Sequence, residues 1–182
     1  FQTNANGCVV QSTDIYGNTN YFTYNDQLQI TSKEFVPNGQ QRGGSTARNS
    51  SYTYDVNNNL ASKTSENGTV TLYGGYNEFS KPGWSAFSLT TNLTVGGSKP
   101  NRSDAGIKLT EMEYDTKGNL TKEIDALGNT VQYTYYPNGL LKTIDNGMGL
   151  RTYYVYDENG WVIEKKEGPS TEDYTSANYR TT

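Results

Sequence analysis

Residues 114–135 read YDTKGNLTKEIDALGNTVQYTY, and this stretch sets the fold class of the chain. It contains two turn signals, DTKG and DALG, in which aspartate opens the turn and glycine supplies a positive φ near its end. Outside the turns, apolar and polar residues alternate, as in residues 130–135, which is typical of half-buried β-strands. The stretch therefore predicts two short strands and two turns, which together form a β-hairpin unit.

This unit recurs along the chain with a period of 21 residues, as Tyr114, Tyr135 and Tyr156 show. Internal repetition at such a period is the signature of a repeat architecture. We predict a single all-β repeat array over residues 1–182, an antiparallel hairpin meander that is curved and open. The repeats are clearest over residues 110–163, and inserted loops are expected at about 37–48 and 84–106. The expected repeat positions are Tyr24, Tyr54, Tyr114, Asp115, Gly118, Asp125, Gly128, Tyr133, Tyr135, Gly139, Asp145, Gly149, Tyr154, Tyr156, Asp157 and Gly160.

Aromatic residues occur in pairs two positions apart at the end of the second strand of each unit. Residues at i and i+2 of a strand face the same side of the sheet, so the pairs should form rows across the repeats. Only 32 % of residues are hydrophobic, yet 16 are tyrosines. We therefore expect the tyrosine rows to act as the core of the sheet. The pairs are Phe22/Tyr24, Tyr52/Tyr54, Met112/Tyr114, Tyr133/Tyr135 and Tyr154/Tyr156.

Composition excludes several classes of function. The chain has no histidine, which removes Ser-His-Asp and Cys-His catalysis and histidine-based metal sites. One cysteine, Cys8, permits neither an internal disulfide nor a site of several thiolates, and a buried, inert thiol is expected. A net charge of −4 disfavours nucleic acid and anionic membranes as partners. We predict no enzymatic activity, no cofactor, no metal site and no membrane insertion.

The motif Tyr-Asp-x-x-Gly-Asn-Leu, followed by Asp-x-x-Gly-Asn-x-x-x-Tyr-x-Tyr, resembles the YD-repeat or Rhs-repeat family. The match is strong over residues 110–163, fair over 14–30 and 52–80, and absent over 84–106. The resemblance implies a section of a long β-sheet that spirals into a hollow shell. Such shells enclose toxins in bacterial polymorphic toxins and insecticidal toxin complexes, and related shells serve adhesion in teneurins.

The resemblance further implies a structural role in a secreted or cell-surface protein. The expected partners are flanking YD repeats of the same or another chain, and an enclosed toxin or a glycan or protein ligand. The Asp-Pro-x-Gly-Leu motif, which the family links to self-cleavage, is missing from this sequence. The chain is therefore expected to be a section of the shell wall that contains neither the cleavage site nor the toxin.

Two other functions stay open at this point. Trp84 and Trp161, with exposed tyrosines, could bind a carbohydrate or a protein by stacking, and open strand edges could lead to self-assembly. Hydrolysis by paired carboxylates such as Glu111 and Glu113 is disfavoured, because the recurring aspartates sit at turn positions. Calcium at the turn oxygens is disfavoured too, because the spacing of known calcium loops is missing.

Overall fold

The computed structural model describes residues 1–89, 93–94 and 97–181. In these residues the chain forms fifteen strands and no helix, and the strand order in the sheet follows the order in the chain. The strand pairs with a defined register are all antiparallel, which confirms the predicted all-β meander. The strands belong to two compact units, of residues 1–74 with 85–107 and of residues 75–84 with 108–182, which are described separately.

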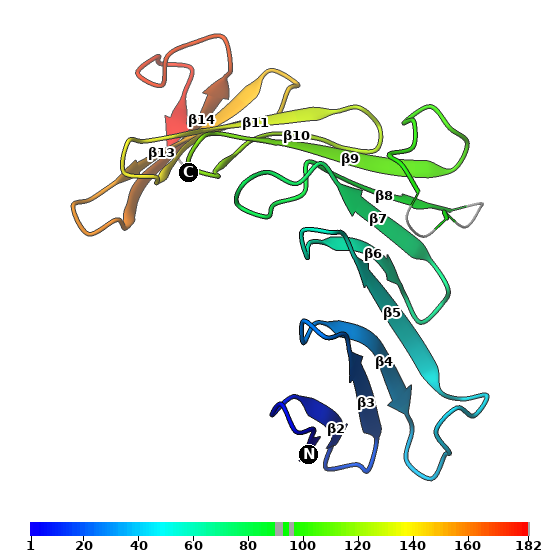
Figure 1. The fold of residues 1–182 in the computed structure, drawn as a ribbon. Coiled ribbons are helices and arrows are strands. Elements are labelled where there is room, and N and C mark those ends of the chain that lie inside the picture. The colour runs from blue at the N-terminus through cyan, green and yellow to red at the C-terminus, as the bar shows by residue number, and fades with distance from the viewer. Residues whose placement is uncertain (90–92, 95–96, 182) are drawn as a thin grey trace. The chain divides into compact units, whose positions relative to one another are not determined.

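The first unit begins with seven strands joined by short turns (Figure 1). They are β1 (Gln2–Thr3), β2 (Val9–Thr13), β3 (Thr19–Tyr24), β4 (Ile30–Val36), β5 (Arg48–Tyr54), β6 (Leu60–Thr64) and β7 (Val70–Gly74). Each pairs with the strands before and after it, from β1/β2 to β6/β7. The segment expected as the first inserted loop connects β4 to β5.

The segment 84–106 differs from the expected loop, because it opens with β8 (Trp84–Ser88). Its sequence WSAFS alternates in burial, with Ala86 only 1 % exposed and Phe87 exposed. The repeat spacing is lost here, but the period-2 pattern of a strand is retained over these five residues. Residues 90–92, 95 and 96 of the expected loop lie outside the described residues.

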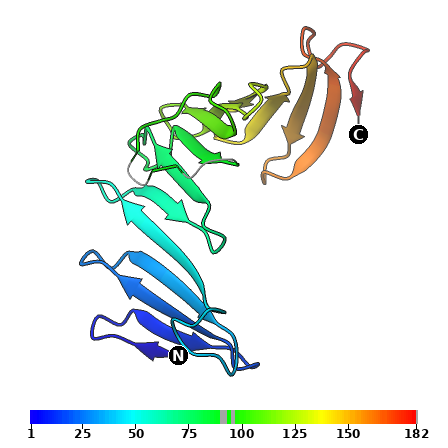
Figure 2. The same cartoon turned by 90° about the vertical axis from the view of Figure 1, so that its right-hand side faces the viewer.

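The second unit carries the clearest repeats, and its strands lie side by side in chain order (Figure 2). They are β9 (Ile107–Tyr114), β10 (Leu120–Ile124), β11 (Thr130–Tyr135), β12 (Leu141–Asp145), β13 (Leu150–Tyr156), β14 (Val162–Pro169) and β15 (Arg180–Thr181). Residues 170–179 connect β14 to β15 through a series of turns. The predicted strand at 130–135 is present with the predicted bounds.

The expected tyrosine core is wrong for both units. None of the paired tyrosines is buried, and all are half-buried. The buried apolar residues are instead Val36, Val70, Leu72, Ala86 and Ile107 in the first unit, and Leu109, Tyr153 and Tyr179 in the second. A single sheet covers only one side of each row, so rings at these positions stay partly open to water.

Candidate functional site

The turn at Asp125 shows how the repeat holds its shape. The backbone N–H of Asp125 donates to the carbonyl of Asn129 (2.9 Å), and that of Gly128 donates to the carbonyl of Asp125 (3.0 Å). Gly128 has φ +88°, which closes a type I turn with a bulge residue in the left-handed region. The carboxylate of Asp125 accepts the N–H groups of Leu127 (2.8 Å) and Asn129 (2.9 Å) and the side-chain amide of Asn129 (2.9 Å). One aspartate thus satisfies three donors of a five-residue loop.

The same loop recurs along both units with the same hydrogen bonds. Asp14, Asp55, Asp115 and Asp157 each accept the N–H groups two and four positions later. Asn25 and Asn77 do so in two further loops, in which asparagine replaces the aspartate of the motif. The residues with positive φ at the fourth position of these loops are Gly17, Leu28, Asn58, Ser80, Gly118 and Gly160.

The hydrogen bonds lower the pKa of the carboxyl groups of Asp14, Asp55, Asp115 and Asp125. For Asp14, Asp115 and Asp125 the largest cause is the side-chain amide of the asparagine that ends the loop, and for Asp55 it is the backbone N–H of Asn59. A general acid needs a raised pKa and a free proton, whereas these groups are ionised acceptors with their lone pairs occupied. Their chemistry is that of turn formation.

Asp145 is not at the turn position that the sequence predicted for it. It is the last residue of β12, and the turn position belongs to Asn146, whose side chain accepts the N–H groups of Met148 and Leu150. Asp145 instead forms an ion pair with Arg151 (3.0 Å) and accepts the N–H of Gly147 (3.0 Å). The N–H of Asn146 donates to the carbonyl of Leu150, as that of Asp125 does to Asn129, so the loop keeps its length and Asp145 lies one residue before it.

Tyr136 takes the aspartate position in the preceding loop, since its N–H donates to Leu140 O and its carbonyl accepts from Gly139. It has no carboxylate to cap the loop. Its hydroxyl instead donates to the carbonyl of Tyr154 (2.8 Å) and lies 3.2 Å from the hydroxyl of Tyr153. Its ring packs edge-on against Tyr153 and Tyr156. The departure from the motif thus joins this loop to β13.

In four of the loops, the tyrosine that precedes the loop makes a recurring hydrogen bond. Its hydroxyl donates to the carbonyl of the first residue of the preceding strand, as for Tyr24 to Val9, Tyr54 to Ile30 and Tyr135 to Leu120, at 2.7 to 2.8 Å. Tyr114 makes the corresponding bond to Pro82, just before β8 (3.1 Å). Strand pairing shifts register at Tyr24, Tyr54 and Tyr135, as it does at a β-bulge. The hydroxyl therefore explains why tyrosine rather than phenylalanine occupies this position.

A second polar pattern lies between the paired aromatics. The threonine between them, Thr23, Thr53 or Thr134, forms a hydroxyl pair across the strands with Ser32, Ser62 or Thr143, at 2.7 Å in each case. Ser62 and Thr143 are buried. These hydroxyl pairs were not predicted from the sequence. The recurring Thr-Tyr dipeptide is the sequence signal that marks the threonine of each pair.

The two tryptophans lie in different surroundings. Trp84 is half-buried, and its ring occupies the space in which a Cβ on Gly75 would sit (3.1 Å). Trp161 is 72 % exposed and closes the Asp157 loop through its backbone N–H. The structure does not bring the two residues into one site.

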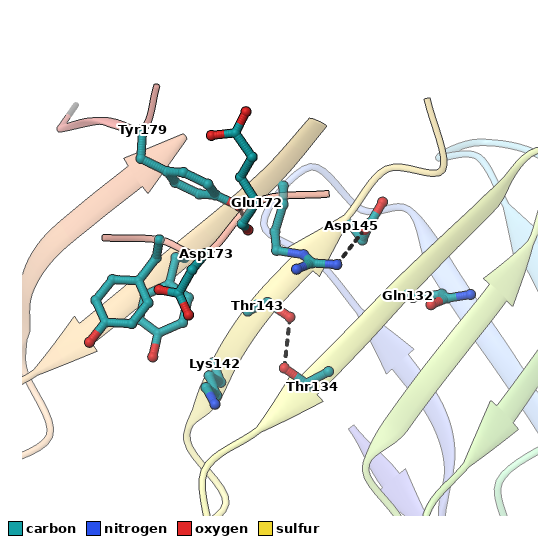
Figure 3. Close-up of a pocket in the computed structure, with 11 residues that line it drawn as sticks. Gln132, Thr134, Lys142, Thr143, Asp145, Glu172, Asp173 and Tyr179 are labelled. Carbon is teal, nitrogen blue, oxygen red and sulfur yellow. Dashed lines mark hydrogen bonds and ion pairs between the residues drawn. The ribbon is translucent and has the colours of Figure 1, made fainter. Parts of the chain in front are cut away.

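The best-formed cavity of the second unit has a volume of about 310 Å³ and is shown in Figure 3. Its floor is the polar side of β11, β12 and β13, with Gln132, Thr134, Thr143, Asp145, Arg151 and Tyr153. Residues 172–179 cover it, with Glu172, Asp173, Tyr174 and Tyr179 facing the cavity. The ring of Tyr174 stacks on that of Tyr153 at 4.1 Å. Sequence reasoning missed this cavity, because residues from three strands and a loop form it.

The cavity contains a buried hydrogen-bond donor that lacks an acceptor among the described residues. The Nε of Arg151 is buried and has no partner among the described residues, although its Nη2 binds Asp145. Lys142 lies over the rings of Tyr136 and Tyr153 at 5.8 and 5.9 Å. Burial, and then the hydroxyl of Tyr136, raise the pKa of Tyr153 well above its usual value, so this phenol stays protonated. The site can offer hydrogen bonds to oxygen atoms of a ligand.

Among the described residues, no group of three or more cysteine, aspartate or glutamate side chains is placed to hold a metal ion. Over the same residues, the chain contains no helix with the length and apolar character needed to cross a membrane.

The sequence matches no protein-family model and no curated protein. The fold matches solved structures of a bacterial toxin. The crystal structure of TcdB2-TccC3-TEV aligns with a TM-score of 0.57 at 14 % identity, over 93 % of this chain and 10 % of that one. TcdB2-TccC3 without its hypervariable C-terminal region gives 0.56 at 14 % identity, over 94 % and 10 % of the two chains.

A structure of the Photorhabdus luminescens Tc holotoxin pore with a mutated TccC3 gives a TM-score of 0.53 at 15 % identity, over 91 % of this chain and 10 % of that one. This chain therefore spans about a tenth of the length of the solved chains that it matches. At this identity the likeness establishes the fold alone. The chain has the all-β, open meander fold of a segment of a Tc toxin shell, as the resemblance to the YD-repeat family predicted.

Proposed function

We propose that this chain is a section of wall in a secreted or cell-surface β-shell, which encloses or displays a partner domain, and that it performs no chemistry. The observation that carries the proposal is the repeated bond from a tyrosine hydroxyl to the carbonyl at the start of the preceding strand. It ties each of these strands to the strand before it, at a position where pairing with the following strand shifts register. Such ties suit a continuous barrier between two compartments, and the match to a segment of a toxin complex supports this role.

Limited proteolysis of the complete gene product tests the wall. A domain behind the wall should resist protease in the native protein and become cleavable when the wall is destabilised by Leu72→Ala. The exposed substitution Val56→Ala, at a loop tip, is the matched control. If the other domains are cut at the same rate in all three proteins, enclosure is wrong.

Size-exclusion chromatography with light scattering separates a wall segment from a self-assembling unit. A monomer at all concentrations agrees with the wall, whereas growth into filaments favours pairing of the strand edges.

The cavity on β11 to β13 supports a second candidate function, the binding of a small polar ligand. Two basic and three acidic residues line it, which leaves a net charge of −1 and disfavours an anion. The unpartnered Nε of Arg151 favours a neutral ligand rich in oxygen, such as a saccharide.

Titration with a panel of mono- and disaccharides, followed by NMR shifts, tests the second function. Arg151→Met and Tyr174→Ala should abolish binding, and Trp161→Ala should leave it unchanged because Trp161 lies outside the cavity. No shift with any sugar, or equal loss in all three variants, rules out this site.

A further inference from the structure

The sequence contains six Asn-Gly dipeptides, at Asn6, Asn38, Asn67, Asn138, Asn146 and Asn159. This dipeptide is the one most prone to spontaneous deamidation, because glycine leaves its backbone nitrogen unhindered. The nitrogen of the glycine attacks the side-chain carbonyl carbon of the asparagine. The bond between the side-chain carbon and its amide nitrogen breaks, and this nitrogen leaves as ammonia after it gains, through water, the proton that the glycine nitrogen loses. Water then opens the resulting succinimide to isoaspartate or aspartate.

In five of these dipeptides the glycine nitrogen, which would make the attack, already donates a hydrogen bond. The N–H of the glycine donates to a backbone carbonyl at Gly7 (3.0 Å), Gly68 (2.8 Å), Gly139 (2.8 Å) and Gly160 (3.1 Å). At Gly147 it donates to the carboxylate of Asp145 (3.0 Å). The attack needs this proton to leave and the nitrogen to turn toward the side chain, so each of these hydrogen bonds must break first.

The dipeptide Asn38–Gly39 is different. Both residues are exposed in the loop between β4 and β5 (Figure 1), and the N–H of Gly39 makes no hydrogen bond within the described residues. A Cβ placed on Gly39 would meet nothing within 4 Å, so no neighbouring side chain crowds this residue. From this contrast we infer that Asn38 is a site of spontaneous conversion to isoaspartate, and that the other five asparagines are protected by the turns of the repeat.

The conversion has a structural consequence. The N–H of Asn38 donates to the side-chain oxygen of Asn18 (3.1 Å), and the Asn38 amide lies in the space that a Cβ on Gly17 would occupy (2.7 Å). Isoaspartate inserts a methylene group into the main chain and adds a negative charge here. The contact between this loop and the Asp14 turn should therefore be lost in the modified protein.

Peptide mapping by mass spectrometry, after incubation of the native protein at mildly alkaline pH, tests the inference. The rate at Asn38 should exceed the rates at the other five sites by about fivefold or more, because each of those must first break a hydrogen bond. In denaturant the six rates should converge, since the turns are gone. A native rate at Asn38 equal to or below the others, or the same ranking in denaturant, overturns the assignment.

Asp145→Ala gives an independent test of the cause, because it removes the acceptor of the Gly147 N–H and leaves the backbone unchanged. Deamidation at Asn146 should then rise toward the rate at Asn38, while the rate at Asn138 stays the same. Asn38→Gln should abolish the fast conversion. If Asn146 keeps its slow rate in Asp145→Ala, the hydrogen bond is not what protects it, and the explanation is wrong.

Discussion

The two units use the same hairpin loop but bury different side chains. In the first unit the buried residues are mostly aliphatic, with Leu72 2 % exposed and Ala86 1 % exposed. In the second unit two tyrosines, Tyr153 and Tyr179, are buried at 8 % exposure. Tyr179 belongs to the segment 170–179, and Tyr174 of the same segment stacks on Tyr153. The repeat therefore determines the turns and the ends of the strands. It does not determine which side chains are buried, and these differ between the two units.

The comparison also separates two contributions to stability. The hydrogen bonds of the loops and of the tyrosine hydroxyls recur along the chain, and each should contribute modestly to the free energy of unfolding. Burial depends on what covers a given position, so it should differ strongly from one position to another.

The largest effect is expected at the aliphatic core of the first unit. Leu72→Ala should lower the free energy of unfolding by about 2–5 kcal/mol, because it leaves a cavity at a fully enclosed position. Urea unfolding followed by circular dichroism measures the change. Val56→Ala, at a residue 97 % exposed, should stay within about 0.5 kcal/mol of the wild type. Equal effects of the two substitutions would mean that Leu72 is not core.

A smaller effect is expected where the second unit buries a tyrosine. A Cβ on Gly168 would lie 2.5 Å from the ring of Tyr179, so Gly168→Ala should displace that ring and cost about 1–3 kcal/mol. In a double-mutant cycle with Tyr179→Ala the two costs should not add, because the first substitution acts through the second residue. Additive costs would contradict this packing.

The hydroxyl bonds of the repeat should contribute less than the core. Tyr135→Phe removes the donor to the Leu120 carbonyl and should lower stability by about 1 kcal/mol. Tyr16→Phe, at a residue 73 % exposed, is the control and should be neutral. If the two substitutions have the same effect in thermal unfolding, the hydroxyl does not tie β11 to β10.

The smallest effect is the dependence of stability on pH. The pKa of Asp125 is lower in the folded chain than its usual 3.8, mainly because of the Asn129 side-chain amide. A lowered pKa contributes stability above the unfolded value, and this contribution is lost as the pH falls through the folded value. Urea midpoints should therefore hold at neutral pH and fall below about pH 4.

The Asp125→Asn variant should show a shallower fall, because it removes one titrating group from the loops. Asp26→Asn is the control, since the side chain of Asp26 accepts no hydrogen bond among the described residues. An identical acid profile for both variants would show that the loop carboxylates do not set the acid limit.

The sequence was sufficient to predict the hairpins, because turn formation is local. An aspartate followed three residues later by glycine supplies both the acceptor and the positive φ, and its strands alternate visibly. Prediction failed where the local signal was ambiguous. The sequence predicted Asp145 as the first residue of its turn, but that position belongs to Asn146, whose side chain accepts the same hydrogen bonds. Leu28 was missed, because no sequence rule places leucine at φ +62°.

The amino-acid sequence by itself determined the period, the turns and the antiparallel meander, since each depends on residues within a few positions of one another. Only the tertiary structure decided which side chains are buried, that the tyrosine hydroxyls reach the preceding strand, and that residues 172–179 roof a cavity on β11 to β13. These contacts join residues that lie 10 to 40 or more positions apart in the chain. Whether a tyrosine ring on this sheet is buried depends on whether another segment packs over it. The 21-residue repeat does not encode that segment, so the repeat alone does not predict which rings are buried.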